Sequence, residues 1–156
     1  MGLTQDLLSE PVSKLPVVSA LTVSGSTLVS VVIAKMRDVR IGCAIVVDDH
    51  GRPDGKFTEH QLAKLLVDQP DFLNQPVGNF IRDYWAQIRH DEPIANLIHK
   101  LQTYCQRHVV VVDDDGKATG VVGQRGLMIY LSEKFPRLGK VQSMDSRVAI
   151  ETREGA

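Results

Sequence analysis

The sequence predicts a mixed α/β (α+β) fold made of two β-α-β-β-α repeats, packed by pseudo-two-fold symmetry into one module. The string AIVVDDHG at residues 44–51 returns as VVVVDDDG at residues 109–116. The same offset of 65 positions aligns residues 8–68 with residues 73–133 without a gap. A repeat at fixed spacing indicates duplication of a structural unit. Apolar residues form 43% of the 156-residue chain, enough for a packed core. We therefore expect a first repeat at 8–68, a second at 73–133 and a C-terminal tail at 134–156.

Each repeat carries the same order of elements. A short apolar segment follows Pro11 in the first copy and Pro76 in the second. Apolar residues at helical spacing then predict a helix in both copies. These residues are Val29, Val32, Ile33 and Met36 in the first copy, and Ile94, Leu97, Ile98 and Leu101 in the second. An all-apolar strand, an Asp/Gly turn, a second short strand and a second helix from about Thr58 or Gly123 complete the unit.

The two all-apolar strands explain why the string is written twice. A continuous apolar run indicates a strand buried on both faces. A unit of about 60 residues buries little surface and is marginally stable alone, whereas two packed copies place both strands inside. Such a symmetric pair also has two equivalent clefts between its halves, where strand ends and helix N-termini converge.

The first copy enters its second helix as GKFTEHQL at residues 55–62. Thr58 followed by Gln61 has the form of a capping box, in which each side chain bonds the backbone of the other. Alternatively, the Thr58 hydroxyl and the amides of the first turn hold a phosphate, because a helix N-terminus attracts anions. The two interpretations are compatible, since a cap can be exchanged for a ligand oxygen.

The second copy reads GVVGQRGL at residues 120–127, with Gly123 and Gly126 at the positions of Thr58 and Gln61. No side chain caps this helix start, so we expect its amide donors to be open to solvent or to an anion. Arg125 stands beside them, either as a bidentate phosphate ligand or as a solvated surface arginine. Its counterpart in the first copy is His60.

These repeats resemble a tandem pair of CBS domains, the cystathionine-β-synthase-type regulatory module. The features that match are Pro-Val before each repeat, the strands ending in VVDDHG and VVDDDG, and the segments GKFTEHQL and GVVGQRGL. The resemblance implies binding of an adenosine-containing ligand: AMP, ADP, ATP or S-adenosylmethionine. It also implies that Thr58 contacts phosphate, that Gln61 stands where the family has a ribose-binding carboxylate, and that Thr22 and Val23 lie beside the adenine.

The candidate ligand contacts implied in this way come from both copies. They are Thr22, Val23, Gly55, Phe57, Thr58, His60 and Gln61 in the first copy, and Ile88, Arg89, Gly120 and Arg125 in the second.

Other function classes find little support. The formal net charge is −1 with no basic stripe, which argues against nucleic acid or an anionic membrane as a partner. No apolar run is long enough to span a membrane, and the N-terminus lacks the pattern of a signal peptide. Cys43 and Cys105 show no paired spacing, so we expect reduced thiols and a cytoplasmic protein. No nucleophile motif supports an enzyme.

No metal site is expected either. An EF-hand beginning at Asp113 would require glycine and glutamate where Ala118 and Gln124 stand, and the five histidines show no ligand spacing. The Asp/Gly segments are better explained as turns.

Two functions from different classes remain. The first is a stand-alone regulatory module, a homodimer that binds the adenosine-containing ligand and modulates an unknown partner protein. The second is a ligand-free dimerisation or protein-interaction module whose clefts have decayed, which Gln61, Gly123 and Gly126 permit. Trp85, the single tryptophan, is expected in a core or an interface, and the tail is either frayed or an arm that docks on a second subunit.

Overall fold

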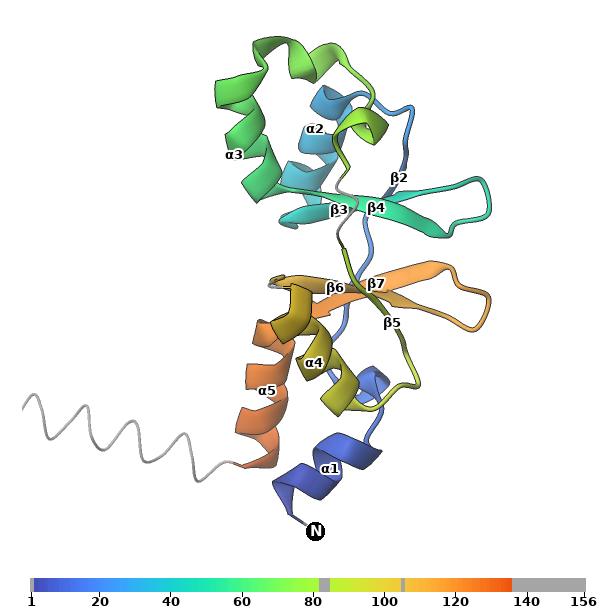
Figure 1. Cartoon of the computed structure of the whole chain (residues 1–156), viewed down its shortest axis with the longest axis vertical. Coiled ribbons are helices and arrows are strands. Elements are labelled where there is room, and N and C mark those ends of the chain that lie inside the picture. Colours follow the sequence, from blue (N-terminus) through green and yellow to red (C-terminus); the bar gives the residue numbers. More distant parts are fainter. Residues whose placement is uncertain (1, 82–84, 105, 136–156) are drawn as a thin grey trace, which may run out of the picture.

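The two all-apolar segments form the central strands of two sheets that face each other (Figure 1). The structure, a computed structural model, describes residues 2–81, 85–104 and 106–135. The first lobe contains β2 (Thr22–Ser24), β3 (Cys43–Val47), β4 (Pro53–Thr58), α2 (Val29–Val39), α3 (Glu59–Asp68), η2 (Pro70–Asn74) and η3 (Val77–Phe80). The second lobe contains α1 (Leu3–Ser9), η1 (Val12–Lys14), β1 (Val18–Ser19), β5 (Gln87–Arg89), α4 (Ile94–Tyr104), β6 (His108–Val112), β7 (Ala118–Gly123) and α5 (Gln124–Lys134). The two β-α-β-β-α units and the mixed α/β fold are as the sequence predicts.

The sheets repeat the same strand register. The first has the order β2-β3-β4 and the second the order β1-β7-β6-β5. β2 runs parallel to β3, and β4 runs antiparallel to it. β5 and β7 stand in the same relation to β6, with an irregularity at the same step of each hairpin. The duplication seen in the sequence is therefore preserved strand by strand.

The central strands are buried on both faces, as their apolar sequences predict. Ala44 and Val46 of β3 pack against the helices of the first lobe. The alternate residues of β3 and β6 meet between the sheets in a cluster that we call the inter-sheet cluster: Cys43, Ile45, Val110, Val112 and Val121. Trp85 packs against this cluster, in agreement with its expected place in a core. Because successive strand residues point to opposite faces, one apolar run serves two cores.

The Asp/Gly segments form twin turns, which confirms the explanation offered for them. The Asp48 carboxylate accepts hydrogen bonds from the amides of His50 and Arg52 at 2.8 and 2.9 Å. Asp113 makes the equivalent pair of bonds at 2.9 Å each. Gly51 and Gly116 complete the turns with φ values of 78° and 79°, which favour glycine.

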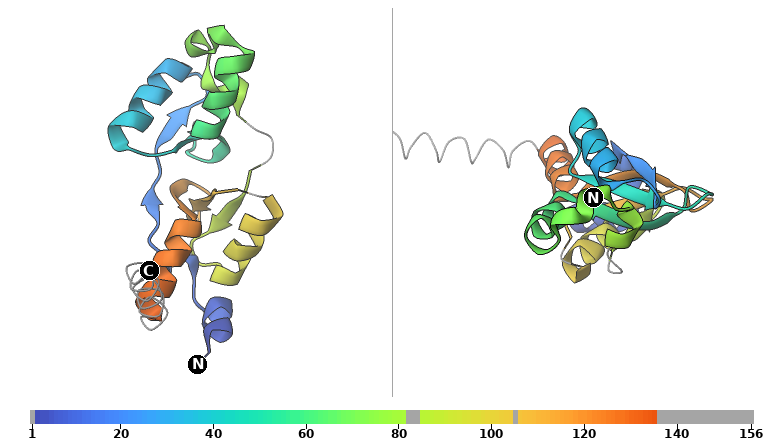
Figure 2. Two further views of the ribbon diagram at one scale, coloured as in Figure 1. Left: turned by 90° about the vertical axis from the view of Figure 1, so that its left-hand side faces the viewer. Right: turned by 90° about the horizontal axis from the view of Figure 1, so that it is seen from above.

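The segments that open the two repeats are exchanged between the lobes. β1 pairs with β7, and Val12 and Leu15 belong to the core of the second lobe. Phe72 and Val77, which precede β5 in the chain, belong to the core of the first lobe. Figure 2 shows the early part of the chain, which carries β1 and β2, running from one lobe to the other. The lobes are thus interlocked through covalent chain as well as through the inter-sheet cluster.

A polar cluster fastens α1 to α5 at the outer end of the second lobe. Lys134 donates to the Glu10 carboxylate at 2.5 Å and lies 3.3 Å from Asp6. Tyr130 also donates to Glu10. The hydrogen bonds from Lys134 and Tyr130 lower the pKa of the Glu10 carboxyl. Residues 136–156, which include most of the expected tail, and Cys105 lie outside the described residues. Within the described part of the chain, no helix combines the length and apolarity needed to cross a bilayer.

Candidate functional site

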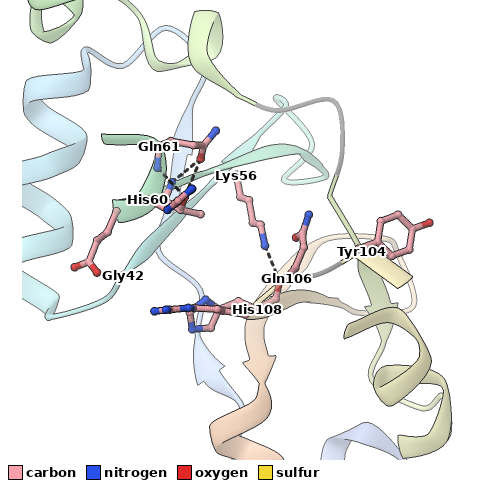
Figure 3. A pocket seen from close by; sticks show the side chains of 10 residues that line it. Gly42, Lys56, His60, Gln61, Tyr104, Gln106 and His108 are labelled. Carbon is pink, nitrogen blue, oxygen red and sulfur yellow. Dashed lines mark hydrogen bonds between the residues drawn. The ribbon is translucent and has the colours of Figure 1, made fainter. Parts of the chain in front are cut away.

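A cleft of about 600 Å³ lies between the two lobes at the start of α3 (Figure 3). The first lobe lines it with residues at the start of β3, in β4 and in the first turn of α3: Gly42, Lys56, Thr58, Glu59, His60 and Gln61. The second lobe lines it with residues at the end of α4 and the start of β6: Tyr104, Gln106, Arg107 and His108. We call this space the Lys56 cleft. Three of the candidate contacts, Thr58, His60 and Gln61, are therefore brought together.

Thr58 and Gln61 form the capping box that their spacing predicts. The Gln61 amide donates to Thr58 Oγ1 at 3.3 Å, and the Thr58 amide donates to Gln61 Oε1 at 2.8 Å. The Gln61 side-chain amide also donates to the carbonyl of Phe80 at 3.0 Å. These two bonds engage both ends of the Gln61 side chain, which is only 5% exposed. A ligand hydroxyl would have to replace one of these bonds.

Lys56 reaches from the first lobe to the second. Its side chain is 7% exposed, and its ammonium donates to the carbonyl oxygen of His108 at 2.6 Å. Figure 3 shows this bond crossing the cleft from β4 to the start of β6. A buried ammonium is costly unless it is paired, so its position at a cleft wall is a significant electrostatic feature. Burial, together with the charges of Lys56 and Arg107, lowers the pKa of His108.

The charge balance of the cleft favours an anion. Lys56 and Arg107 are the two basic side chains other than histidine among the described lining residues, and Glu59 is the one carboxylate among them. The N-terminus of α3, capped by Thr58, adds the positive end of a helix dipole. Two histidines, His60 and His108, also line the space. The arrangement can therefore hold a phosphate group between the two lobes.

The other candidate contacts of the first copy lie in the first lobe, outside the lining of the Lys56 cleft. Phe57 is fully buried and Val23 is 4% exposed, both in the core beneath α2 and α3. Gly55 is required for close packing, because a Cβ there would lie 2.9 Å from the Cβ of Ile81. Thr22 is exposed at the start of β2 and is not among the residues that line the Lys56 cleft.

The second-copy candidates are not gathered at the Lys56 cleft. Ile88 is 1% exposed in the core of the second lobe. Arg89 pairs with Asp91 at 3.0 Å and with Asp114 at 2.9 Å, at the hairpin end of the sheet. That end lies opposite His108, because Arg89 is aligned with Val112 at the other terminus of β6.

Gly120 and Gly123 allow neighbouring main chain to approach closely, because neither carries a Cβ. A Cβ on Gly120 would lie 2.3 Å from Val17 Cγ1 and 2.7 Å from the carbonyl oxygen of Val18. A Cβ on Gly123 would lie 2.0 Å from the carbonyl oxygen of Arg107. Gly123 makes no side-chain cap, as predicted, and main chain already fills the space that a capping side chain would need. That the amides at the start of α5 are open to an anion stays a prediction. Arg125 is exposed on the first turn of α5.

Comparison with known protein families agrees with this architecture. The family model of the CBS domain matches residues 6–68 and 77–133. The chain belongs to the CBS domain family. Comparison with curated proteins gives no significant match.

Solved structures share the fold of this CBS pair at low sequence identity. A CBS domain protein from Pyrobaculum aerophilum complexed with AMP is 21% identical, with a TM-score of 0.69 over 76% of this chain and 90% of that one. The CBS domain pair of protein MJ0100, in complex with 5′-methylthioadenosine and S-adenosyl-L-methionine, is 23% identical, with a TM-score of 0.67 over 80% and 98%. The cytosolic domain of the Mg²⁺ channel MgtE, in complex with ATP, is 20% identical, with a TM-score of 0.61 over 72% and 45%.

Sequence reasoning named three of the ten residues that line the cleft of this CBS pair and missed the other seven. Lys56 carries a signal in hindsight, because it is a charged residue in a strand whose copy has valine at the matching place, Val121. The lining residues at 104–108 carry no motif. They reach the cleft only because the lobes face each other, which sets the start of β6 against the start of α3.

Proposed function

We propose that this CBS pair is a regulatory module that binds an adenosine-containing ligand in the Lys56 cleft and modulates a partner protein. One observation carries the proposal: the capped start of α3 shares a polar cleft with Lys56 and Arg107. AMP, ADP, ATP and S-adenosylmethionine are the candidate ligands. Structural neighbours with the same fold are complexed with AMP, with ATP, or with S-adenosylmethionine and methylthioadenosine.

The phosphate end of a nucleotide is assigned to the first turn of α3. There the Thr58 hydroxyl donates to a phosphate oxygen once it exchanges its bond to Gln61 Oε1 for the ligand, while Arg107 approaches from the second lobe. The ribose is assigned to Gln61, provided that its side-chain amide exchanges the bond to Phe80 for a bond to a hydroxyl. Thr22 remains the candidate for the adenine side.

Regulation requires that the ligand prefer one arrangement of the lobes. A ligand shifts a conformational equilibrium only by the difference between its affinities for the two states. The bond from Lys56 to the carbonyl of His108 links the lobes directly at the cleft. A ligand anion that attracts the Lys56 ammonium competes with this bond, so binding is coupled to the spacing of the lobes.

Thermal unfolding with each ligand tests the proposal. A ligand that binds the native state raises the melting temperature, by an amount that grows with its concentration above Kd. The shift should be large for at least one of AMP, ADP, ATP and S-adenosylmethionine, and should be lost in Thr58→Ala. Each variant is compared with and without ligand, because loss of the cap lowers its own melting temperature. Thr58→Ser keeps the hydroxyl and should keep the shift.

The second candidate function is a ligand-free dimerisation or protein-interaction module. The engagement of both ends of Gln61 and the backbone contact at Gly123 favour it. Absence of a shift with all four ligands would support this alternative. Light scattering of the purified chain then tests the expected homodimer, and affinity capture tests the expected partner protein.

A further inference from the structure

The duplication gives every residue of the Lys56 cleft a counterpart 65 positions away, so the wall of this cleft can be compared, side chain by side chain, with the matching positions of the other copy. Lys56 corresponds to Val121, Gln106 to Ile41, and His108 to Cys43. These three lining residues of the Lys56 cleft are polar or charged, whereas their counterparts in the other copy are apolar.

The counterparts are packed into the protein interior. Cys43 is 1% exposed and Val121 is 3% exposed, and both belong to the inter-sheet cluster. Ile41 packs against the same cluster. Burial raises the pKa of the Cys43 thiol, which keeps it neutral at this place. At these three positions the duplicate of the polar cleft wall is apolar core, which contributes to stability by removing apolar surface from water. The counterparts of Glu59 and His60, which are Gln124 and Arg125, are polar and exposed.

The start of α5 has no room for the polar side chains that stand at the start of α3. A Cβ on Gly123 would lie 2.0 Å from the Arg107 carbonyl oxygen, and one on Gly126 would lie 3.4 Å from the Pro16 carbonyl oxygen. These positions therefore cannot carry a hydroxyl or amide like those of Thr58 and Gln61, although a main-chain carbonyl, that of Gly42, also lies at the start of α3.

We infer that the chain binds one phosphate-bearing ligand, in the Lys56 cleft alone, and that Lys56 selects the phosphate. The inference rests on the proposed function and narrows it. Lys56 is a buried cation at the wall of a cleft whose other side carries the exposed Arg107, and a phosphate placed between the two side chains is attracted by both. A ligand with a sulfonium in place of the phosphate would set a third positive charge beside these two.

Isothermal titration calorimetry with AMP and with adenosine measures both parts of the inference. AMP should bind with a stoichiometry of one per chain, and adenosine, which lacks only the phosphate, should bind at least roughly tenfold more weakly. Two sites per chain would overturn the inference while leaving the proposed function intact. Equal affinities for AMP and adenosine would do the same. Absence of binding by AMP, adenosine, ADP, ATP and S-adenosylmethionine would overturn both.

Matched variants locate the site. Lys56→Met should weaken AMP binding roughly ten- to hundredfold and leave adenosine binding nearly unchanged, since a charge-assisted bond is lost only with the phosphate. Arg107→Gln should weaken AMP binding in the same selective way. Because the Arg107 side chain is exposed, this variant should fold and provides the test even if Lys56→Met misfolds. Arg125→Ala is the control at the start of α5 and should bind AMP as the wild type does. Loss of AMP binding in Arg125→Ala with retention in both other variants would refute the assignment.

Discussion

Helix capping and tertiary packing predict opposite effects on stability when Gly123 is replaced by threonine. Gly123 is the N-cap of α5 and has no side chain to cap it, whereas Thr58 caps α3 at the matching place. From capping alone, Gly123→Thr should stabilise the protein by a few tenths of a kcal/mol. The structure predicts the opposite sign, because a Cβ at Gly123 would lie 2.0 Å from the Arg107 carbonyl oxygen and 3.1 Å from its carbon.

The magnitude follows from this contact. The φ of −155° at Gly123 is extended backbone open to any residue, so the obstacle is the close approach itself. Relief requires the start of β6 to move, and overpacking of this kind costs about 1–3 kcal/mol. For a chain of this size each kcal/mol lowers the melting temperature by about 3 °C, so we expect a decrease of about 3–9 °C.

Urea denaturation and thermal unfolding of Gly123→Ala, Gly123→Thr and Gly25→Ala make up the assay. Gly123→Ala isolates the contact from any gain by capping. Gly25→Ala is the matched control, since a Cβ there meets its nearest neighbours at an ordinary 3.7 Å. A melting temperature for Gly123→Thr at or above that of the wild type would refute the packing described for the start of α5.

Three further predictions concern pH and packing. The pKa of His108 is lowered in the folded state, so the unfolded chain binds the proton more readily. The free energy of unfolding should therefore decrease as the pH falls below the ordinary histidine pKa of 6.5. Urea titrations at several pH values should show that His108→Gln flattens this dependence. Lys134→Met should lower the melting temperature at pH 7 by more than the exposed control Lys64→Met. Because the pKa of Glu10 is lowered below its ordinary 4.5, this difference should disappear as the pH falls well below that value, and a difference that persists would contradict the ion pair. Phe72→Ala should cost about 3–5 kcal/mol and expose the amides of β3 to hydrogen exchange before those of β6; the reverse order would contradict the placement of Phe72 in the first lobe.

The sequence by itself determined the features that depend on neighbouring residues or on periodicity. The duplication, the two strands buried on both faces and the helix over Val29–Val39 follow from the spacing of apolar residues. The turns at Asp48 and Asp113 and the capping box of Thr58 follow from side chains that bond backbone within four residues. Each of these interactions is satisfied locally, so it can be recognised from a few adjacent letters.

Only the tertiary structure decided which core each segment joins and what faces the start of α3. Leu15 precedes β2 of the first lobe and packs in the second lobe, whereas Phe72 precedes β5 of the second lobe and packs in the first. The hydrophobic effect is non-directional, so an apolar residue does not specify its partner along the chain. Arg107 likewise reaches the Lys56 cleft, and its carbonyl fills the space at Gly123, through the packing of distant elements. These contacts depend on how the two lobes face each other, which no stretch of neighbouring residues encodes.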